Sequence, residues 1–483
     1  MLDVIIIGAG IVGSSVAYIL SKYDIKVLVL EKDNEVANGT TKANSAIIHA
    51  GNDPIPGTLK AKLNILGHKM TEEICKELNV DFQRIGSLTV AFSDEQVEMI
   101  HKLHERGKIN GAETYILSRE EVLEKEPNVR EDVKLGLYAP DTAIIAPWDL
   151  VFAQLEHAIV NGTEVKVNQE VVDIQKEDHY FIVKTQSDTF KTRYIINAAG
   201  VFAEKISRMV TNQPGFKTIP TRGQYYVLDR DCKNYVNSVI YPTPSSKGKG
   251  VLVVPTVHGN ILLGPTAEFI DDVEGTETTK EGFRSIRESL SMMMKNIPYR
   301  SNIRTFSGIR AKTDRDDFII EELKDVPNFI QLAGIESPGL TAAPAIAKYV
   351  EDILLQKETF KLRDDYIIYR QQQIRISELE PEEINEQIKK NPLYGRIICR
   401  CEHVSEGEIM DAIHRPLGAT TIDGIKRRAR PGAGRCQGGF CQPHVIQILA
   451  RELKLPVTDI VLNNPNSNIL IEESKLVGGD ERE

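Results

Sequence analysis

Several features are missing from this 483-residue sequence, and each absence excludes a class of protein. No segment approaches the roughly 20 consecutive apolar residues of a transmembrane helix. The N-terminal apolar run Val4–Ile7 lacks the basic leader of a signal peptide. A net charge of −10 and a pI near 5.7 give no general attraction to nucleic acid. We therefore expect a cytoplasmic globular protein with no nucleic-acid partner, and 41% hydrophobic residues suffice for a sizeable core.

Cysteine is scarce, and its distribution is uneven. Of the six cysteines, four form two close pairs near the C-terminus, with CxC and CxxxxC spacing. In a reducing compartment such a group is more often a metal site than two disulfides. Four thiolates suit an iron–sulfur cluster or a structural zinc ion, and CxC is less typical of zinc. The predicted metal ligands are Cys399, Cys401, Cys436 and Cys441.

A run of basic residues accompanies the second cysteine pair: Lys426, Arg427, Arg428, Arg430 and Arg435. The usual interpretation of such a run is a solvated face. Near an iron–sulfur cluster, positive charge and N–H donors would also raise the reduction potential.

The N-terminus carries a dinucleotide-binding pattern. An apolar strand at 3–7 leads into Gly8-x-Gly10-x-x-Gly13, followed by a helix to about residue 21 and a strand at 26–30. The glycines allow a tight turn, close approach of a pyrophosphate and close helix–strand packing, and the helix N-terminus offers free N–H groups. Glu31 ends the second strand, where an acid would bind ribose hydroxyls. The pattern predicts a dinucleotide but does not separate FAD from NAD.

Three further segments resemble the D-amino-acid oxidase-like superfamily of flavoproteins. Residues 40–51 are similar to the segment that passes the flavin ring, 196–200 to a second flavin-domain strand, and 334–341 to the C-terminal flavin segment. The resemblance implies FAD as the cofactor and a helix N-terminus directed at the flavin, where it would stabilise negative charge. The FAD-binding residues implied, besides the glycines and Glu31, are Thr40, Thr41, Asn44, Ser45, Ala199, Gly200, Gly308, Gly334, Gly339, Leu340 and Thr341.

Within that superfamily, residues 1–360 most resemble glycerol-3-phosphate dehydrogenases and oxidases, with L-2-hydroxyglutarate oxidoreductases close behind. Both groups oxidise a secondary alcohol beside an anionic group by hydride transfer to flavin. His49 is the candidate base, although it could merely orient the substrate. Arg310 is the candidate anion clamp, with a simple ion pair as the alternative. Ser337 could contact the substrate or only cap a helix.

The substrate prediction depends on Lys247-Gly248-Lys249-Gly250, which resembles a Lys-Gly segment of the glycerol-3-phosphate group. A phosphate dianion gains more from a second cation than a carboxylate does, so Lys249 favours sn-glycerol 3-phosphate, unless the segment is only a flexible basic turn. The alternatives are L-2-hydroxyglutarate or another 2-hydroxy acid, and a flavin/iron–sulfur electron-transfer subunit that oxidises no substrate itself.

The residues around both cysteine pairs resemble the [2Fe-2S]-binding module named for bacterioferritin-associated ferredoxin. The resemblance implies a [2Fe-2S] cluster, with zinc as the alternative. It also implies electron transfer to a partner protein or quinone pathway, so any membrane association would be peripheral, through a partner.

These observations predict an α/β and α+β protein. A Rossmann-like FAD-binding domain, at roughly 1–80, 145–215 and 305–360, interleaves with a mixed-sheet substrate domain at 81–144 and 216–304. We expect a helical linker at 361–390, the small four-cysteine domain at 391–455 and a tail at 456–483.

Overall fold

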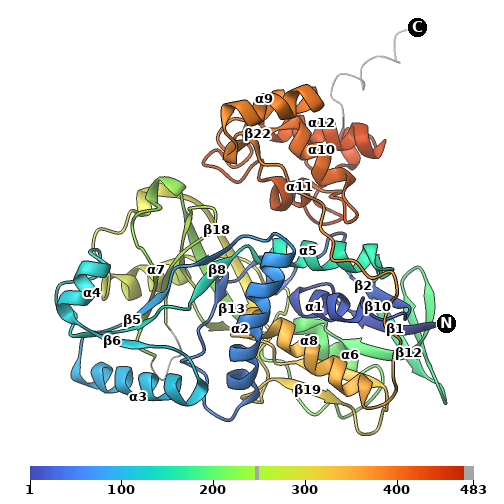
Figure 1. Cartoon of the computed structure of the whole chain (residues 1–483), viewed down its shortest axis with the longest axis horizontal. Helices are drawn as coiled ribbons and strands as arrows, with labels where there is room; N and C mark the ends of the chain where they lie inside the picture. Colours follow the sequence, from blue (N-terminus) through green and yellow to red (C-terminus); the bar gives the residue numbers. More distant parts are fainter. Residues whose placement is uncertain (245–249, 473–483) are drawn as a thin grey trace.

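The first of three regions is built on an eight-stranded sheet. The computed structural model describes residues 1–244 and 250–472 (Figure 1). Five parallel strands form the centre of the sheet, in the order β20 (Phe329–Ala333), β12 (Thr189–Asn197), β1 (Leu2–Ile7), β2 (Val27–Leu30) and β9 (Glu164–Lys166). Antiparallel strands β10 (Val171–Lys176), β11 (Phe181–Thr185) and β19 (Ile319–Glu322) extend it. Strands β1, β2 and β20 are mostly apolar because both faces of the sheet are covered at its centre.

Helices on one face form the main core. Helix α1 (Ile11–Leu20) follows β1 and packs beside α5 (Pro147–Val160) and α8 (Gly339–Leu355), with α2 (Leu59–Glu77) against α8. This core joins side chains from distant parts of the sequence, such as Val16, Leu150 and Ile346, all fully buried. The strand–helix–strand unit expected from the glycine pattern is therefore present as β1, α1 and β2.

The second region is a nine-stranded mixed sheet. Its order is β17 (Glu268–Phe269), β13 (Thr221–Leu228), β16 (Ile261–Gly264), β15 (Leu252–Pro255), β14 (Val239–Pro242), β5 (Ser87–Ala91), β7 (Leu135–Ala139) and β6 (Tyr115–Ser118). Strand β18 (Asn302–Arg310) pairs along β13. Residues 305–310, which we assigned to the FAD-binding part, thus lie in a strand of this sheet.

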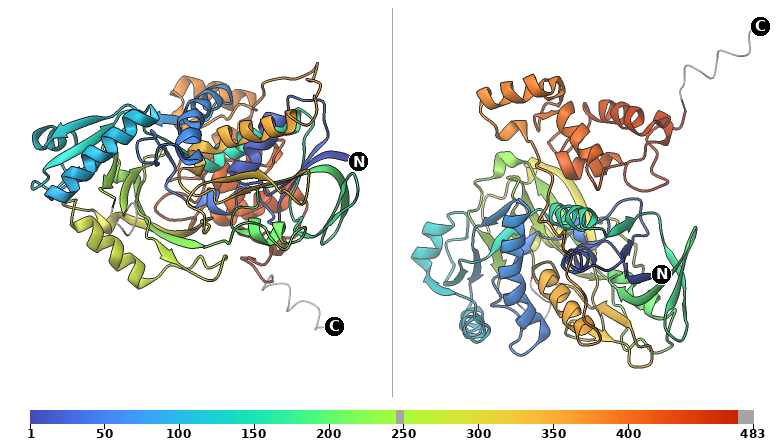
Figure 2. Two further views of the ribbon diagram at one scale, coloured as in Figure 1. Left: turned by 90° about the horizontal axis from the view of Figure 1, so that it is seen from below. Right: turned by 45° about the vertical axis from the view of Figure 1, so that its right-hand side comes forward.

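Shorter elements complete the two larger regions. The sheet regions meet at a small three-stranded sheet of β3 (Ile47–Ile48), β8 (Ala143–Ile145) and β4 (Phe82–Arg84). Helices α3 (Asp94–Asn110), α4 (Arg119–Lys125) and α7 (Lys280–Ser291) flank the nine-stranded sheet, and α6 (Ala203–Ser207) lies by β20 and β12 (Figure 2).

The predicted helical linker at 361–390 is wrong for its first half. Residues 361–375 contain no helix, and only Pro381–Lys390 form one, α9. The reason is that the linker backbone bonds to side chains of α5: the amide of Asn161 donates to the carbonyl of Ile367 at 2.9 Å and accepts from its N–H at 3.0 Å. The N–H of Tyr369 contacts His157 Nδ1 at 3.2 Å. These partners replace the bonds that a helix would have made internally.

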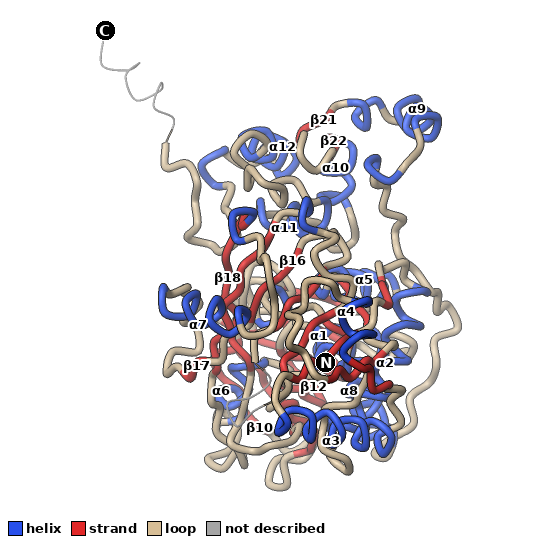
Figure 3. The backbone as a smooth tube through the Cα atoms, turned by 90° about the vertical axis from the view of Figure 1, so that its left-hand side faces the viewer, coloured by secondary structure: helices blue, strands red, loops and turns tan. Residues whose placement is uncertain are grey.

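The third region is a small module above the other two. It consists of a β21 (Ile397–Cys399) and β22 (Val404–Ser405) hairpin and three helices, α10 (Glu406–His414), α11 (Ile422–Ala429) and α12 (Gln442–Leu453). Ile409, Ile425 and Leu449 are fully buried in its separate core. Helix α11 lies nearest to the rest of the molecule (Figure 3).

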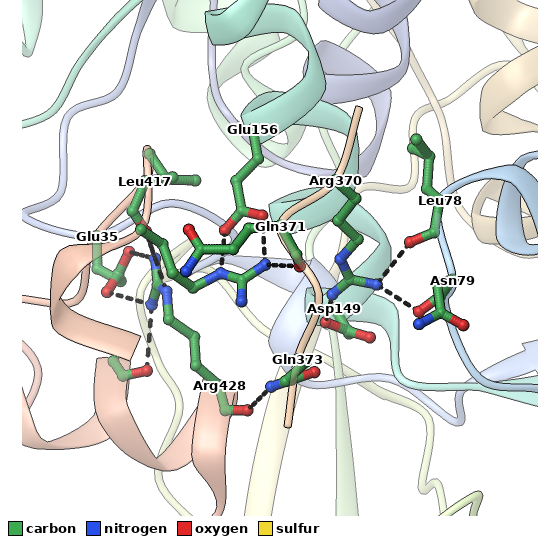
Figure 4. Close-up of polar contacts among 12 residues, drawn as sticks. Glu35, Leu78, Asn79, Asp149, Glu156, Arg370, Gln371, Gln373, Leu417 and Arg428 are labelled. Carbon is green, nitrogen blue, oxygen red and sulfur yellow. Dashed lines mark hydrogen bonds and ion pairs between the residues drawn. The ribbon is translucent and has the colours of Figure 1, made fainter. Parts of the chain in front are cut away.

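The module docks through buried arginine–carboxylate pairs, so the solvated-face interpretation of the basic run is wrong for most of it. Arg428 binds both carboxylate oxygens of Glu35, at 3.0 and 3.1 Å (Figure 4). Arg415 binds both oxygens of Glu156, at 2.6 and 2.7 Å. All four side chains are at most 5% exposed. Arg427 and Arg428 face the first region because carbonyls and a carboxylate there bind them. Arg430 pairs instead with Glu402 of the module, and the exposed Arg435 pairs with Asp229 and Asp231 of the second region.

Candidate functional site

An elongated cavity of about 270 Å³ runs along the carboxyl end of the central strands. Its lining extends from Glu31 at the end of β2, past the glycine turn after β1, to His49 and the start of α8. Ligands of open α/β sheets bind at this edge.

The glycine turn is shaped for a close-approaching ligand. Gly8 has a φ of +105°, and a Cβ there would lie 2.6 Å from the carbonyl oxygen of Ala198. A Cβ on Gly13 would lie 1.9 Å from the carbonyl oxygen of Gly8, so the third glycine serves packing and does not line the cavity. The N-cap of α1 is Gly10, which offers no side chain, and although the N–H of Ile11 donates to Thr41 Oγ1 at 3.0 Å, the N–H groups of Val12 and Gly13 remain for phosphates.

Glu31 is held as a buried acid at the far end of the cavity. Its carboxylate accepts the N–H of Ala9 at 2.8 Å and of Asp33 at 3.1 Å. Burial raises the pKa of Glu31 to about 7, against the lowering effect of the Ala9 N–H. A carboxyl group in this position can accept hydrogen bonds from ribose hydroxyls.

His49 lies at the opposite end, directly after β3. Its N–H donates to Thr341 Oγ1 at 3.0 Å, which fixes the backbone against α8. Ring atom Nε2 lies 3.3 Å from Ser337 Oγ, and Nδ1 lies 3.3 Å from the hydroxyl of Tyr241. Ser337 is not the helix N-cap, because Pro338 holds that position. The structure thus brings His49 and Ser337 together in the cavity wall.

Arg310 ends β18 and lines the same cavity. Its Nη2 donates to the carbonyl of Thr266 at 3.1 Å, and among residues 1–244 and 250–472 no carboxylate lies within 4.0 Å of it. Arg222, on the neighbouring strand, is instead paired with Glu268 and Glu277. The ion-pair alternative for Arg310 is therefore wrong, and its guanidinium keeps donors for an anionic ligand.

Most predicted cofactor residues line the cavity, but not all. Gly8, Gly10, Glu31, Thr40, Thr41, Asn44, Ser45, Ala199, Gly200, Gly308, Gly339 and Leu340 do. Gly13, Gly334 and Thr341 lie behind its wall. Lys249 lies outside the described residues.

The sequence analysis missed two tyrosines. Tyr225 lines the cavity with its hydroxyl 3.2 Å from Ser45 Oγ, and Tyr241 contacts His49. Tyr225 lies in β13, where the alternation of side chains between the two faces of the sheet could have suggested it. No local pattern pointed to Tyr241.

The four clustered cysteines come from the two ends of the small module. Sγ of Cys401 lies 3.8 Å from Sγ of Cys399 and 3.8 Å from Sγ of Cys436. Cys399 and Cys441, the latter at the N-cap of α12, are buried in the module core, whereas Cys401 and Cys436 are half-buried. Gly434 leaves room for the group, since a Cβ there would lie 2.6 Å from Sγ of Cys401.

Comparison with known proteins gives two family matches, one on each side of the linker. Residues 3–353 match the model of the FAD dependent oxidoreductase family, and residues 397–451 match the BFD-like [2Fe-2S] binding domain. A glycerol 3-phosphate dehydrogenase of Caloramator mitchellensis is 50% identical over 98% of this chain and 99% of its own length.

The chain belongs to the FAD-dependent oxidoreductase family.

Two other relatives of this oxidoreductase are informative. The FAD-bound L-alpha-glycerophosphate oxidase of Mycoplasma pneumoniae superposes with a TM-score of 0.73 at 34% identity, covering 77% of this chain and 99% of the oxidase. An L-2-hydroxyglutarate dehydrogenase of Escherichia coli is 30% identical over 60% of this chain and 69% of its own.

The oxidoreductase binds FAD and a [2Fe-2S] cluster. The glycine turn, the buried carboxyl group of Glu31 and the elongated cavity fit FAD. The four thiols lie close together beside Gly434, where a Cβ would collide with Sγ of Cys401. This arrangement fits a cluster with four sulfur ligands. Among the described residues, no helix is long and apolar enough to cross a membrane.

Proposed function

We propose that this oxidoreductase converts sn-glycerol 3-phosphate to dihydroxyacetone phosphate and passes the electrons through its [2Fe-2S] cluster to a partner acceptor. The observation that carries the proposal is Arg310, a cavity-lining guanidinium with no carboxylate partner among the described residues. The names of the C. mitchellensis and M. pneumoniae relatives support the same substrate. FAD supplies the hydride acceptor when bound in the cavity.

In this proposal, His49 accepts the hydroxyl proton of the substrate. The role requires Nδ1–H to donate to the Tyr241 hydroxyl, which leaves the Nε2 lone pair on the Ser337 side of the ring. Ser337 Oγ then serves as a second polar contact for the alcohol. Arg310 binds the phosphate in a bidentate manner, and Lys249 adds a second cation.

The 2-hydroxy acid alternative keeps the same base and the same clamp. It is supported by the 30% identity to the E. coli L-2-hydroxyglutarate dehydrogenase, which is lower and covers less of the chain. A pure electron-transfer subunit is disfavoured because such a protein has no use for an anion clamp beside a base.

The electron exit is proposed at the exposed side of the cysteine site. Phe440 lies between Cys436 and Cys441 in sequence and is 82% exposed. The exposed residues that flank the cysteines in sequence, Arg400, Pro443 and His444, include no acid, and the exposed Asp231 is paired with Arg435. An exposed aromatic residue among basic and neutral neighbours suits contact with an acidic protein acceptor.

The test is an anaerobic substrate titration of the purified holoprotein, followed by its flavin absorption. We expect rapid bleaching by sn-glycerol 3-phosphate and little by L-2-hydroxyglutarate. Bleaching by L-2-hydroxyglutarate alone would replace the substrate. No bleaching by either compound, nor by a panel of other 2-hydroxy acids, would support the electron-transfer alternative.

A further inference from the structure

The loop Glu35–Asn38 lies between the FAD cavity and the small module. On its inner side, Asn38 lines the cavity, and the N–H of Ala37 donates to the carbonyl of Ala9 within the glycine turn at 3.0 Å. Ala37 has a φ of +56°, a left-handed conformation that a residue with a Cβ adopts only at an energetic cost. A loop of this kind needs outside contacts to keep its shape.

Helix α11 of the module supplies those contacts from the other side. Arg427 Nη1 donates to the carbonyls of Val36 and Ala37, at 3.1 and 3.2 Å. The neighbouring Arg428 holds Glu35 in the buried bidentate pair (Figure 4). Two consecutive arginines therefore fix both the side chain that begins the loop and the strained backbone at its centre.

A third contact lies at the end of the loop. The Asn38 amide nitrogen donates to Asp33 Oδ2 at 2.9 Å and to Asn464 Oδ1 at 3.2 Å, so it joins the cavity wall to the segment after α12. The amide oxygen accepts from Lys42 Nζ at 2.6 Å, next to Thr40 and Thr41 in the cavity lining. The loop that carries Asn38 into the cavity wall is thus bonded to the module at three successive points.

We infer that Arg427 and Arg428 are positioning residues of the FAD site, and that FAD binding and docking of the small module strengthen each other. A ligand that requires one loop conformation and a module that holds the same conformation are thermodynamically linked, and the linkage is reciprocal. The inference depends on FAD binding and not on the identity of the alcohol, so failure of the proposed substrate would leave it standing.

The FAD-bound M. pneumoniae oxidase indicates that the module is not essential for FAD binding. That FAD-bound protein is covered almost entirely by 77% of this chain, so the fold itself can hold FAD without a counterpart of the remaining residues. In this chain, however, Glu35 is buried against Arg428, and separation of the module would leave the loop without its partners. We therefore expect weaker FAD binding after undocking, not its complete loss.

Arg415 provides a matched control. Its pair with Glu156 is as buried as the Arg428 pair and also docks the module, but Glu156 lies in α5 and not in the loop that carries Asn38 into the FAD cavity. Arg415→Gln should loosen the module without releasing the loop. Arg427→Gln and Arg428→Gln should do both, and Glu35→Gln should behave like Arg428→Gln.

The measurement is the affinity of full-length holoprotein for FAD, from flavin fluorescence on dilution, with cluster absorption as a check that the module is folded. We expect Kd for FAD to rise between about 5- and 150-fold in the Arg427 and Arg428 variants, the usual range of coupling between sites. Arg428→Lys should restore part of the affinity, and Arg415→Gln should change it less than about threefold. Equal effects at Arg415 and Arg428, or no effect at Arg428, would overturn the inference.

A second measurement on the unmodified chain covers the case in which a variant fails to fold. Hydrogen exchange of residues 422–429 is compared between holoprotein and FAD-depleted protein. Faster exchange of α11 after FAD removal, with α12 unchanged, is the expected result. Unchanged exchange in α11 would contradict the linkage.

Discussion

The FAD cavity and the cysteine site of this oxidoreductase are assembled in contrasting ways. Residues lining the cavity are spread from Ile7 to Leu340 and are brought together by two sheets and several loops. The four thiols come from two pairs within 43 residues and one small core. The contrast teaches that a distributed site depends on the packing of the whole fold, including the docked module, whereas a local site depends mainly on its own hairpin and helices.

The largest effect is expected from a substitution that disrupts only the cysteine site. Cys436→Ser removes one of four sulfur ligands and should abolish the cluster absorption, because a serine hydroxyl is a poor replacement for a thiolate. The flavin spectrum should remain, since the cavity is built from other residues. The isolated Cys232→Ser is the control and should leave both spectra unchanged. Loss of FAD together with the cluster would show that the two sites are not separately built.

The second prediction concerns Arg310, the proposed anion clamp in the FAD cavity. Arg310→Gln should raise KM for sn-glycerol 3-phosphate by about 100-fold, on the order of 3 kcal/mol, because it removes a charged donor facing the substrate anion. Arg315→Gln is the matched control, because Arg315 lies exposed in a pair with Glu321. Steady-state kinetics with an artificial acceptor measures both variants. An unchanged KM in Arg310→Gln would exclude that residue from the substrate site.

A smaller effect is expected at the exposed rim of the cysteine site. Phe440→Ser should slow reduction of a protein acceptor by about tenfold, or ~1.4 kcal/mol, while leaving flavin reduction by substrate unchanged. Exposed Leu455, elsewhere on the module surface, offers Leu455→Ser as a control. If a soluble dye and a protein acceptor respond equally to Phe440→Ser, the residue does not form part of a docking surface.

The last prediction concerns the pH dependence of stability where the module meets the first region. Burial lowers the pKa of Lys42 and of Lys426, each to about 8, and nearby cations add to the shift. Their unfolded-state values are higher, so between pH 8 and 10.5 these two groups bind fewer protons in the folded protein, and their contribution to stability rises with pH. Burial raises the pKa of Cys75 and of Tyr241, which act in the opposite direction, so the contribution is isolated by comparing the parent chain with Lys426→Gln. We expect the difference in unfolding free energy between the two proteins to change by roughly 1–3 kcal/mol across that window, measured by denaturant unfolding. An identical pH dependence of the unfolding free energy in Lys426→Gln and in the parent chain would show that Lys426 does not contribute to it.

The sequence predicted the elements with strong local patterns. The strands at 3–7 and 26–30 and the helix between them correspond to β1, β2 and α1, and the fold class and both cofactors are confirmed. Helix α1 begins at Ile11, directly after the second glycine of the pattern. The assigned roles of His49, Arg310, Ser337 and Lys249 stay predictions.

What the sequence could not provide is the contact between regions. Arg428 and Glu35 are separated by 393 positions, and each alone has the pattern of a surface residue. The extended course of the linker is equally hidden, since its charged residues alternate with apolar ones at helical spacing. Partners on α5, such as Asn161, decide its conformation, and they become visible only after the chain has folded.

The central claim is that electrons from the alcohol reach the cluster by way of the FAD cavity. The most direct test mixes the oxidised holoprotein anaerobically with sn-glycerol 3-phosphate and follows flavin absorption together with the paramagnetic resonance of the cluster. The account predicts that the flavin bleaches and that a reduced-cluster signal then appears, and that this signal is absent in Cys436→Ser. A flavin that bleaches fully while the cluster stays oxidised would contradict it.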